Sequence, residues 1–123
     1  QYALTQPSRE QMPLSTIDWS LPQNLEFNPI DIKRYPSILL AKEVIQSGGT
    51  SGAVLNAANE IAVQAFLTKK IKFHQIFTIV ERVLDHMHIE QCDSLQAVIN
   101  ADADARKQAL LAIHQENVKE RAL

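Results

Sequence analysis

The sequence has few of the residues on which phosphate-binding loops and disulfides depend. Its three glycines all lie between positions 48 and 52, so it contains neither the G-x-G-x-x-G nor the G-x-x-x-x-G-K-S/T pattern of a phosphate-binding loop. The one cysteine, Cys92, cannot form an internal disulfide, which fits a reducing compartment. We therefore expect neither a nucleotide-phosphate loop nor a disulfide framework in this chain.

Positive charge and long apolar runs are scarce as well. Lys and Arg number 12 against 14 Asp and Glu, a net charge of −2, which leaves no basic field for a nucleic-acid backbone. No apolar run approaches the roughly 20 residues of a membrane-spanning helix. Gln1 does not open a secretory signal sequence. We expect a soluble protein with no nucleic-acid partner and no membrane association.

What is present is typical of one globular domain preceded by an extended leader. Hydrophobic residues make up 46% of the 123 residues and charged residues 21%, which is the composition of a domain with a core. Residues 1–30 hold four of the five prolines, and proline removes a backbone donor and disfavours helix at the preceding residue. We expect residues 1–30 to form an extended, proline-rich linker whose Trp19 and Phe27 pack on another surface. Residues 31–123 are expected to form the domain.

After the leader, apolar residues recur at the three- and four-residue spacing of buried helix faces. Pro36 suits a first helical turn, the Gly48-Gly49 pair ends that helix, and Thr50 or Ser51 is expected to cap the next one. No segment shows the two-residue alternation of a strand. Short connections between about four helices predict an all-α fold, an antiparallel helical bundle. The expected helices span about residues 36–47, 53–70, 73–87 and 101–119.

The last expected helix is rich in alanine. A short helical segment through Ile99, capped by Asp93 or Ser94, is expected to precede it. Asp102 and Asp104 then lie near a helix start, so we interpret them as caps or partners of the helix dipole rather than as a catalytic dyad. The residues expected to hold this helix to the bundle are Leu110, Leu111 and Ile113.

Histidine and cysteine are the first candidates for a metal site. A small metal-dependent enzyme that uses His86, His88 and Cys92 is one alternative. Helix residues two apart lie on different faces, however, so this spacing suits a metal poorly. We expect a polar helix terminus instead, where histidine meets the negative end of the helix dipole. His74 and His114 have no patterned partner and are expected at the surface.

Other polar residues offer little chemistry. Lys69, Lys70 and Lys72 close the second expected helix, where cations are favoured, and a phosphate-binding role is the alternative. Cys92 has no basic group nearby in the sequence to activate it, and no serine lies in a G-x-S-x-G elbow. The residues themselves therefore predict no catalytic, cofactor-binding or metal-binding residue in this chain.

Asn56, Asn59 and Glu60 interrupt a helix whose other residues predict burial. Asn56 and Glu60 are four residues apart and share a face, so they could present an amide and a carboxylate to a cleft. An unpaired buried amide costs about 1 to 3 kcal/mol, which favours a structural role. We expect these three residues to fasten the second helix to the Gly-Gly-Thr turn or to the neighbouring helix.

One run of residues resembles a known family. Residues 48–67, Gly-Gly-Thr-Ser-Gly-Ala-Val-Leu-Asn-Ala-Ala-Asn-Glu-Ile-Ala-Val-Gln-Ala-Phe-Leu, closely resemble the carboxy-terminal domain of the 1-deoxy-D-xylulose 5-phosphate reductoisomerases. Three further stretches follow the family's order: 34–36 (Arg-Tyr-Pro), 71–73 (Ile-Lys-Phe) and 101–106 (Ala-Asp-Ala-Asp-Ala-Arg). Because the sequence also begins without methionine, we expect it to be a fragment of a longer protein.

The resemblance implies a parent enzyme that is both an oxidoreductase and an isomerase. Such enzymes convert 1-deoxy-D-xylulose 5-phosphate to 2-C-methyl-D-erythritol 4-phosphate, a step towards isoprenoid precursors, with NADPH and a divalent Mg or Mn ion. Their NADPH loop, metal ligands and substrate-binding residues lie upstream of the matched region. The resemblance therefore implies that this chain binds no cofactor or metal of its own and is inactive alone.

The resemblance also implies the chain's partners. These would be the other domains of the parent enzyme, which is expected to be a homodimer in the bacterial cytoplasm or in a plastid-type compartment. A free-standing helical module that binds a protein partner through its apolar leader is the alternative.

Overall fold

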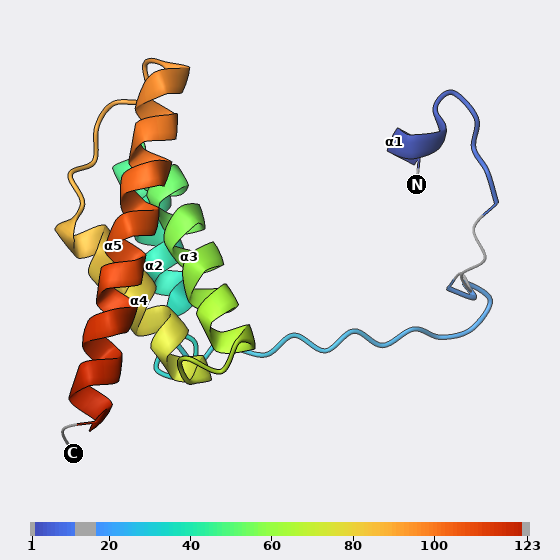
Figure 1. Ribbon diagram of the computed structural model, residues 1–123. Coiled ribbons are helices and arrows are strands. Elements are labelled where there is room, and N and C mark those ends of the chain that lie inside the picture. Colours follow the sequence, from blue (N-terminus) through green and yellow to red (C-terminus); the bar gives the residue numbers. More distant parts are fainter. Residues whose placement is uncertain (1, 12–16, 122–123) are drawn as a thin grey trace.

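The computed structural model describes residues 2–11 and 17–121, with side chains up to residue 116. Within these residues the chain forms helices and no strands, so the expected all-α fold is confirmed. Successive helices of the bundle run in opposite directions (Figure 1). None of the helices in the described part is long and apolar enough to cross a membrane. The helices are α1 (Tyr2–Thr5), α2 (Ser37–Ser47), α3 (Ser51–Leu67), α4 (Phe73–His86) and α5 (Leu95–Arg121).

Helix α3 lies at the centre of the bundle. It packs against α2, α4 and α5, and its most extensive contact is with α5. Small side chains line this contact, because alanines of both helices are completely or almost completely buried. A methyl group lets two helix backbones approach closely, and such packing leaves little room for a larger side chain. The buried alanines are Ala57, Ala58, Ala62 and Ala65 of α3 and Ala105, Ala109 and Ala112 of α5.

The contacts of α5 differ from those expected. Leu110 is 58% exposed and Leu111 is 55% exposed, so the expectation that both hold the helix to the bundle is wrong. Ile113 is buried, as expected. Alanines at positions 105, 109 and 112 recur at helical spacing, and they place Ile113 inward and the two leucines outward. The face of α5 that packs into the bundle is thus narrower than expected, and its side chains are smaller than leucine.

Helix α5 is also one helix rather than two. Its cap is the expected Ser94, whose Oγ accepts a hydrogen bond from the backbone N–H of Ala97 at 3.2 Å. No glycine or proline follows in the sequence, so nothing ends the first segment before the second begins. Asp102 and Asp104 therefore lie inside the helix, and their interpretation as caps is wrong.

The turn between α2 and α3 is built around two glycines with positive φ. Gly48 has a φ of 62° and Gly49 a φ of 53°, a region that residues with a Cβ avoid. Thr50 and Ser51 follow, but the side chain of neither caps α3 as expected. The Ser51 Oγ instead lies within donating distance of the carbonyl oxygens of Val44 at 2.9 Å and Gly48 at 2.6 Å. Each of these oxygens also accepts a backbone N–H, that of Gly48 and that of Ser51 respectively.

Thr50 ties this turn to the connection between α4 and α5. Its backbone N–H donates to the carbonyl oxygen of Glu90 at 2.9 Å. The backbone N–H of Glu90 in turn donates to Thr50 Oγ1 at 3.1 Å. The two residues are 40 positions apart, so this reciprocal pair fixes the α2–α3 turn against a distant segment.

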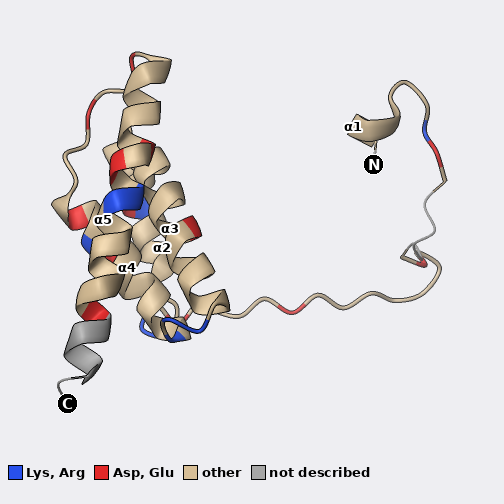
Figure 2. Ribbon diagram, viewed as in Figure 1, with Lys and Arg blue, Asp and Glu red and all other residues tan. Residues whose placement is uncertain are grey.

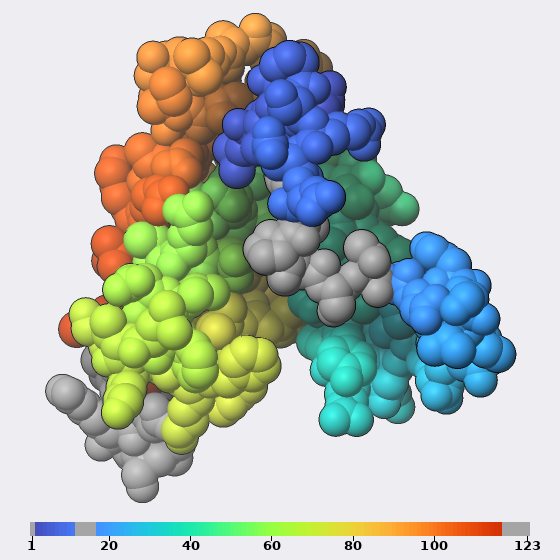
Figure 3. Space-filling model, turned by 90° about the vertical axis from the view of Figure 1, so that its right-hand side faces the viewer, coloured from blue at the N-terminus to red at the C-terminus, as the bar shows by residue number. Residues whose placement is uncertain are grey.

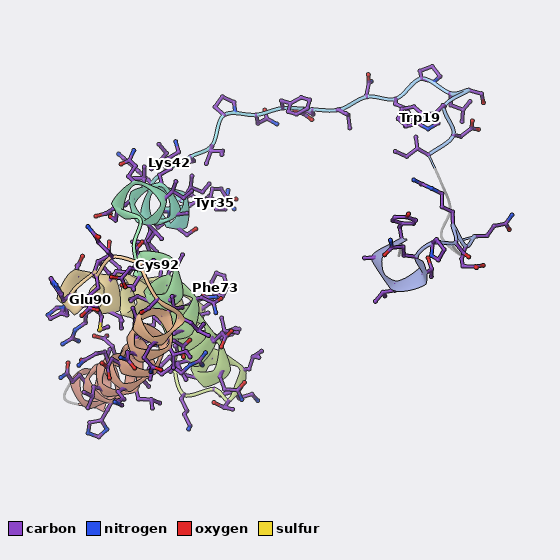
Figure 4. All side chains as sticks on the ribbon, turned by 90° about the horizontal axis from the view of Figure 1, so that it is seen from above. Trp19, Tyr35, Lys42, Phe73, Glu90 and Cys92 are labelled. Carbon is purple, nitrogen blue, oxygen red and sulfur yellow. The ribbon has the colours of Figure 1, made fainter. Side chains whose placement is uncertain are left out.

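The leader lies apart from the bundle. The structure describes no helix between Thr5 and Ser37, and the segment from residue 17 to α2 extends away from the helices (Figure 1). Trp19 is 82% exposed and Phe27 is 88% exposed. Figure 4 shows Trp19 on the leader, well away from the labelled residues of the bundle.

Candidate functional site

A polar cluster joins α3 to α5 on the bundle surface. Arg106 of α5 donates through Nη2 to Glu60 Oε2 of α3 at 2.7 Å and through Nε to Asp102 Oδ2 at 2.7 Å. Asn56 Nδ2 donates to the other carboxylate oxygen of Glu60 at 3.1 Å. We call Asn56, Glu60, Asp102 and Arg106 the α3–α5 polar cluster; its charged residues lie among those coloured in Figure 2.

The cluster holds its charged groups in their ionised forms. Hydrogen bonds from Arg106 and then from Asn56 lower the pKa of the Glu60 carboxyl. The hydrogen bond from Arg106 also lowers the pKa of Asp102, and the two carboxylates together raise the pKa of Arg106. A general acid or base works best with a pKa near the working pH. The cluster therefore suits attachment of α3 to α5 rather than proton transfer.

The sequence analysis predicted the positions of Asn56, Asn59 and Glu60 only in part. Asn56 and Glu60 do share a face, and Glu60 does contact the neighbouring helix, one of the two expected alternatives. Asn56, Asn59 and Glu60 are all exposed, however, so the expectation of burial is wrong. They lie on the side of α3 opposite its buried alanines. Asn59 makes no side-chain hydrogen bond with any residue that the structure describes.

We expect the cluster to make the stability of the chain depend on pH. The pKa of Glu60 lies below its ordinary value of 4.5 in the folded chain, so folding favours the ionised carboxylate. The resulting stabilisation of the folded chain is complete when the pH is well above 4.5, the ordinary pKa of the carboxyl. It is lost as the pH falls through the lower pKa of the folded state. The pKa of Asp102 is likewise lowered from its ordinary value of 3.8, so Asp102 adds a stabilisation that is lost at still lower pH. The urea midpoint of unfolding, followed against pH, measures both.

A neighbouring residue provides the control. Arg106→Gln removes the main cause of both pKa shifts, so its midpoint should vary less between about pH 5 and about pH 3 than that of the unaltered chain. Lys107→Gln removes the same charge one residue later, where Lys107 pairs with Asp104 at 2.8 Å. It should keep the original acid dependence. The same dependence in Arg106→Gln would show that the cluster does not contribute.

A polar groove lies between α5 and the connection from α4. It has a volume of about 520 Å³. Its charged residues are mixed in sign, and Lys107 already pairs with Asp104 across 2.8 Å. The groove therefore presents no concentrated charge to a ligand. Its polar lining consists of Thr50, His88, Glu90, Asn100, Asp104, Lys107 and Gln108.

The histidine and cysteine candidates do not come together. His86 Nδ1 lies 2.8 Å from the carbonyl oxygen of Arg82 on its own helix, whereas His88 lines the groove and Cys92 is exposed. Among the residues that the structure describes, no three His, Cys, Asp or Glu side chains are grouped so that they could hold a metal. The described residues therefore give no support to the metal-dependent alternative built on these three residues. His74 and His114 are exposed, as expected.

The three candidate lysines lie in the connection between α3 and α4. Helix α3 ends at Leu67 rather than near residue 70, and Lys69 adopts a positive φ of 58° just beyond it. Lys69, Lys70 and Lys72 are all exposed. Figure 2 shows blue residues at this end of the bundle. Neither Lys69 nor Lys70 pairs with a carboxylate in the described part of the chain. The phosphate-binding alternative for these lysines stays a prediction.

The sequence analysis of the residues themselves missed three connections. Asp102 and Arg106 are four residues apart, and that spacing could have revealed their pairing. The bridge from Arg106 to Glu60, which spans 46 positions, left no local signal. Nor did the pairing of Thr50 with Glu90, since only the folded chain brings those segments together.

Comparisons with known proteins agree along most of the chain. A family model described as the DXP reductoisomerase C-terminal domain matches residues 1–108. The 1-deoxy-D-xylulose 5-phosphate reductoisomerase of Chlamydia caviae is 44% identical over 106 residues, which cover 86% of this chain and 28% of that protein. The enzyme of the same name from Zymomonas mobilis is 44% identical over 108 residues, covering 88% and 28%.

A solved structure also matches. The chain is similar to 1-deoxy-D-xylulose 5-phosphate reductoisomerase from Zymomonas mobilis in complex with NADPH, with a TM-score of 0.76 and 43% identity. The match covers 91% of this chain and 30% of that one. The chain thus spans less than a third of the length of these relatives.

Proposed function

The chain belongs to the 1-deoxy-D-xylulose 5-phosphate reductoisomerase family, whose carboxy-terminal domain it represents, and on that premise we propose that it is the helical support of such an enzyme. The parent would convert 1-deoxy-D-xylulose 5-phosphate to 2-C-methyl-D-erythritol 4-phosphate with NADPH. The observation that carries this proposal is identity of 40–44% through the matched region of relatives that bear this name. The relative solved with NADPH supports the choice of cofactor.

We place the chemistry outside this chain. The described residues offer no group of metal-ligating side chains, and the sequence has no glycine-rich phosphate loop. The residues present therefore do not fit NADPH or a Mg or Mn ion. Both would bind in the part of the parent that this chain does not cover, and the chain alone would be inactive.

We further propose how the domain is joined to its parent. Residues 1–30 would act as a linker and residues 31–123 as the domain, with the apolar Trp19 and Phe27 of the linker packed against other domains. A buried position would remove these large side chains from water. The parent would be a homodimer in the bacterial cytoplasm or in a plastid-type compartment.

The proposal is tested by comparing the full-length gene product with the 123-residue chain. With 1-deoxy-D-xylulose 5-phosphate and a divalent ion, the full-length protein should oxidise NADPH. The 123-residue chain should show no rate above the protein-free background. NADPH oxidation by the chain alone would overturn the placement of the active site. An inactive full-length protein would favour the alternative, a helical module that binds a protein partner.

A further inference from the structure

The exposed side of α3 has an unusual composition. Of its 17 residues, one is charged, Glu60, and that carboxylate is already bound by Arg106. The residues that define this side follow one another at three- and four-residue spacing and so form a single stripe. Gly52, Asn56, Asn59 and Leu67 are exposed and Val63 is half-buried. We call these five residues the α3 face.

The outer sides of the other long helices are different. Helix α4 exposes Glu81 and Asp85, and α5 exposes Asp104 and Lys107. Charged residues are the usual covering of a helix face that meets water. Depletion of charge, by contrast, marks the centre of an interface between proteins or domains. The α3 face therefore has the composition of a covered surface although it is exposed in this chain.

Unused hydrogen-bonding groups and apolar area support the same conclusion. The Asn59 amide can donate two hydrogen bonds and accept two, and it makes none with the described residues. At the end of the stripe Leu67 is 66% exposed. Close by, Phe73 is 74% exposed, and its ring meets that of Phe66 edge to face at a centroid distance of 5.7 Å. Amides beside exposed apolar side chains suit a partner surface that is uncharged and rich in hydrogen-bonding groups.

The leader indicates which partner could reach the α3 face. Figures 1 and 3 show α3 on the side of the bundle towards which the leader extends. A tether holds whatever it links at a high effective concentration near the domain. The matched relatives are more than three times as long as this chain, so most of such an enzyme lies beyond the matched region.

We propose that the α3 face is the surface on which another domain of the same reductoisomerase chain packs, through an uncharged surface that hydrogen-bonds the Asn59 amide and covers Leu67. This inference rests on the proposed function. Because the α3–α5 polar cluster lies at the edge of the face, it would hold α3 at a fixed orientation under that contact.

Thiol labelling tests the proposal directly. Asn59→Cys and Thr78→Cys are each made in a Cys92→Ser background, in the 123-residue chain and in the full-length gene product. Thr78 is exposed on α4 and is the matched control. The labelling rate at each position is measured by mass spectrometry of its peptide. Full-length context should slow labelling at position 59 by about tenfold or more, which corresponds to about 1.4 kcal/mol of docking. Labelling at position 78 should be unchanged.

The outcomes separate the alternatives. Equal rates at position 59 in both contexts would overturn the proposal, as would protection at position 78 alone. Protection at position 59 that disappears on tenfold dilution of the full-length protein would also overturn it, because a second copy would then be the occupant. Circular dichroism of both variants of the 123-residue chain checks that each folds. NADPH oxidation by the full-length protein is measured separately, so a failed activity proposal leaves the labelling result interpretable.

Discussion

Replacing Gly49 with alanine is expected to destabilise the chain by about 3 to 5 kcal/mol, among the largest effects of any single substitution. A Cβ at this position would lie 2.2 Å from the carbonyl oxygen of Glu90 and 3.2 Å from its carbonyl carbon. Both atoms belong to the backbone, so no side-chain rotation relieves the overlap. The positive φ of 53° adds the strain of a left-handed conformation for a residue with a Cβ.

Gly48→Ala separates the two causes. Gly48 has a similar φ of 62°, but a Cβ there would meet nothing within 4 Å. Its replacement should therefore cost only the conformational strain, about 1 to 3 kcal/mol, because its ψ of −147° places it in a region occupied almost only by glycine. Urea unfolding of the 123-residue chain and of the two variants measures the difference. If both variants lose the same stability, the close approach of Gly49 to Glu90 does not exist in solution.

The effect of Gly49→Ala would extend beyond the turn. Thr50, the next residue, exchanges hydrogen bonds with Glu90 at 2.9 and 3.1 Å, so a displaced turn loses both. The groove beside α5 is lined in part by the same two residues and would change shape with them. The first turn of α3 would shift too, and with it the start of the α3 face.

Periodic apolar residues made much of this fold predictable. The regular stripe over residues 73–87 predicted α4, which the structure places at Phe73–His86. Pro36 was correctly expected at the start of α2, where it has a φ of −65°. These predictions succeed because a buried helix face leaves its three- and four-residue spacing in the sequence whatever it packs against.

Contacts between segments far apart in sequence were not predictable in the same way. The two glycines indicated a turn, but not that Gly49 approaches Glu90. Asn56, Asn59 and Glu60 were expected to be buried because the helix around them is apolar. The centre of the bundle consists of alanines, and their small size lets α3 bury one side fully while its opposite side remains exposed. Composition alone does not distinguish a helix buried all round from one closely packed on a single side.

Ala105→Leu is expected to cost the bundle about 3 kcal/mol, at the upper end for overpacking a well-packed core. Ala105 is 0% exposed and belongs to the same core cluster as Ala58 and Ala62 of α3. A leucine there would force α5 away from α3 or into a strained rotamer. Arg106 is the next residue, so a displaced α5 would also weaken the bridge from Arg106 to Glu60, 2.7 Å long in the intact chain.

Ala103→Leu is the matched control for this prediction. Ala103 lies on the same helix but is exposed, so a leucine there should change the free energy of unfolding by no more than about 0.5 kcal/mol. Urea unfolding of both variants gives the comparison. Comparable small losses would mean that α3 and α5 are not closely packed through their alanines. A large loss for Ala105→Leu alone would show that the separation of these two helices is set by residues that look unremarkable in the sequence. The position of the α3 face would then depend on alanines that are buried beneath it.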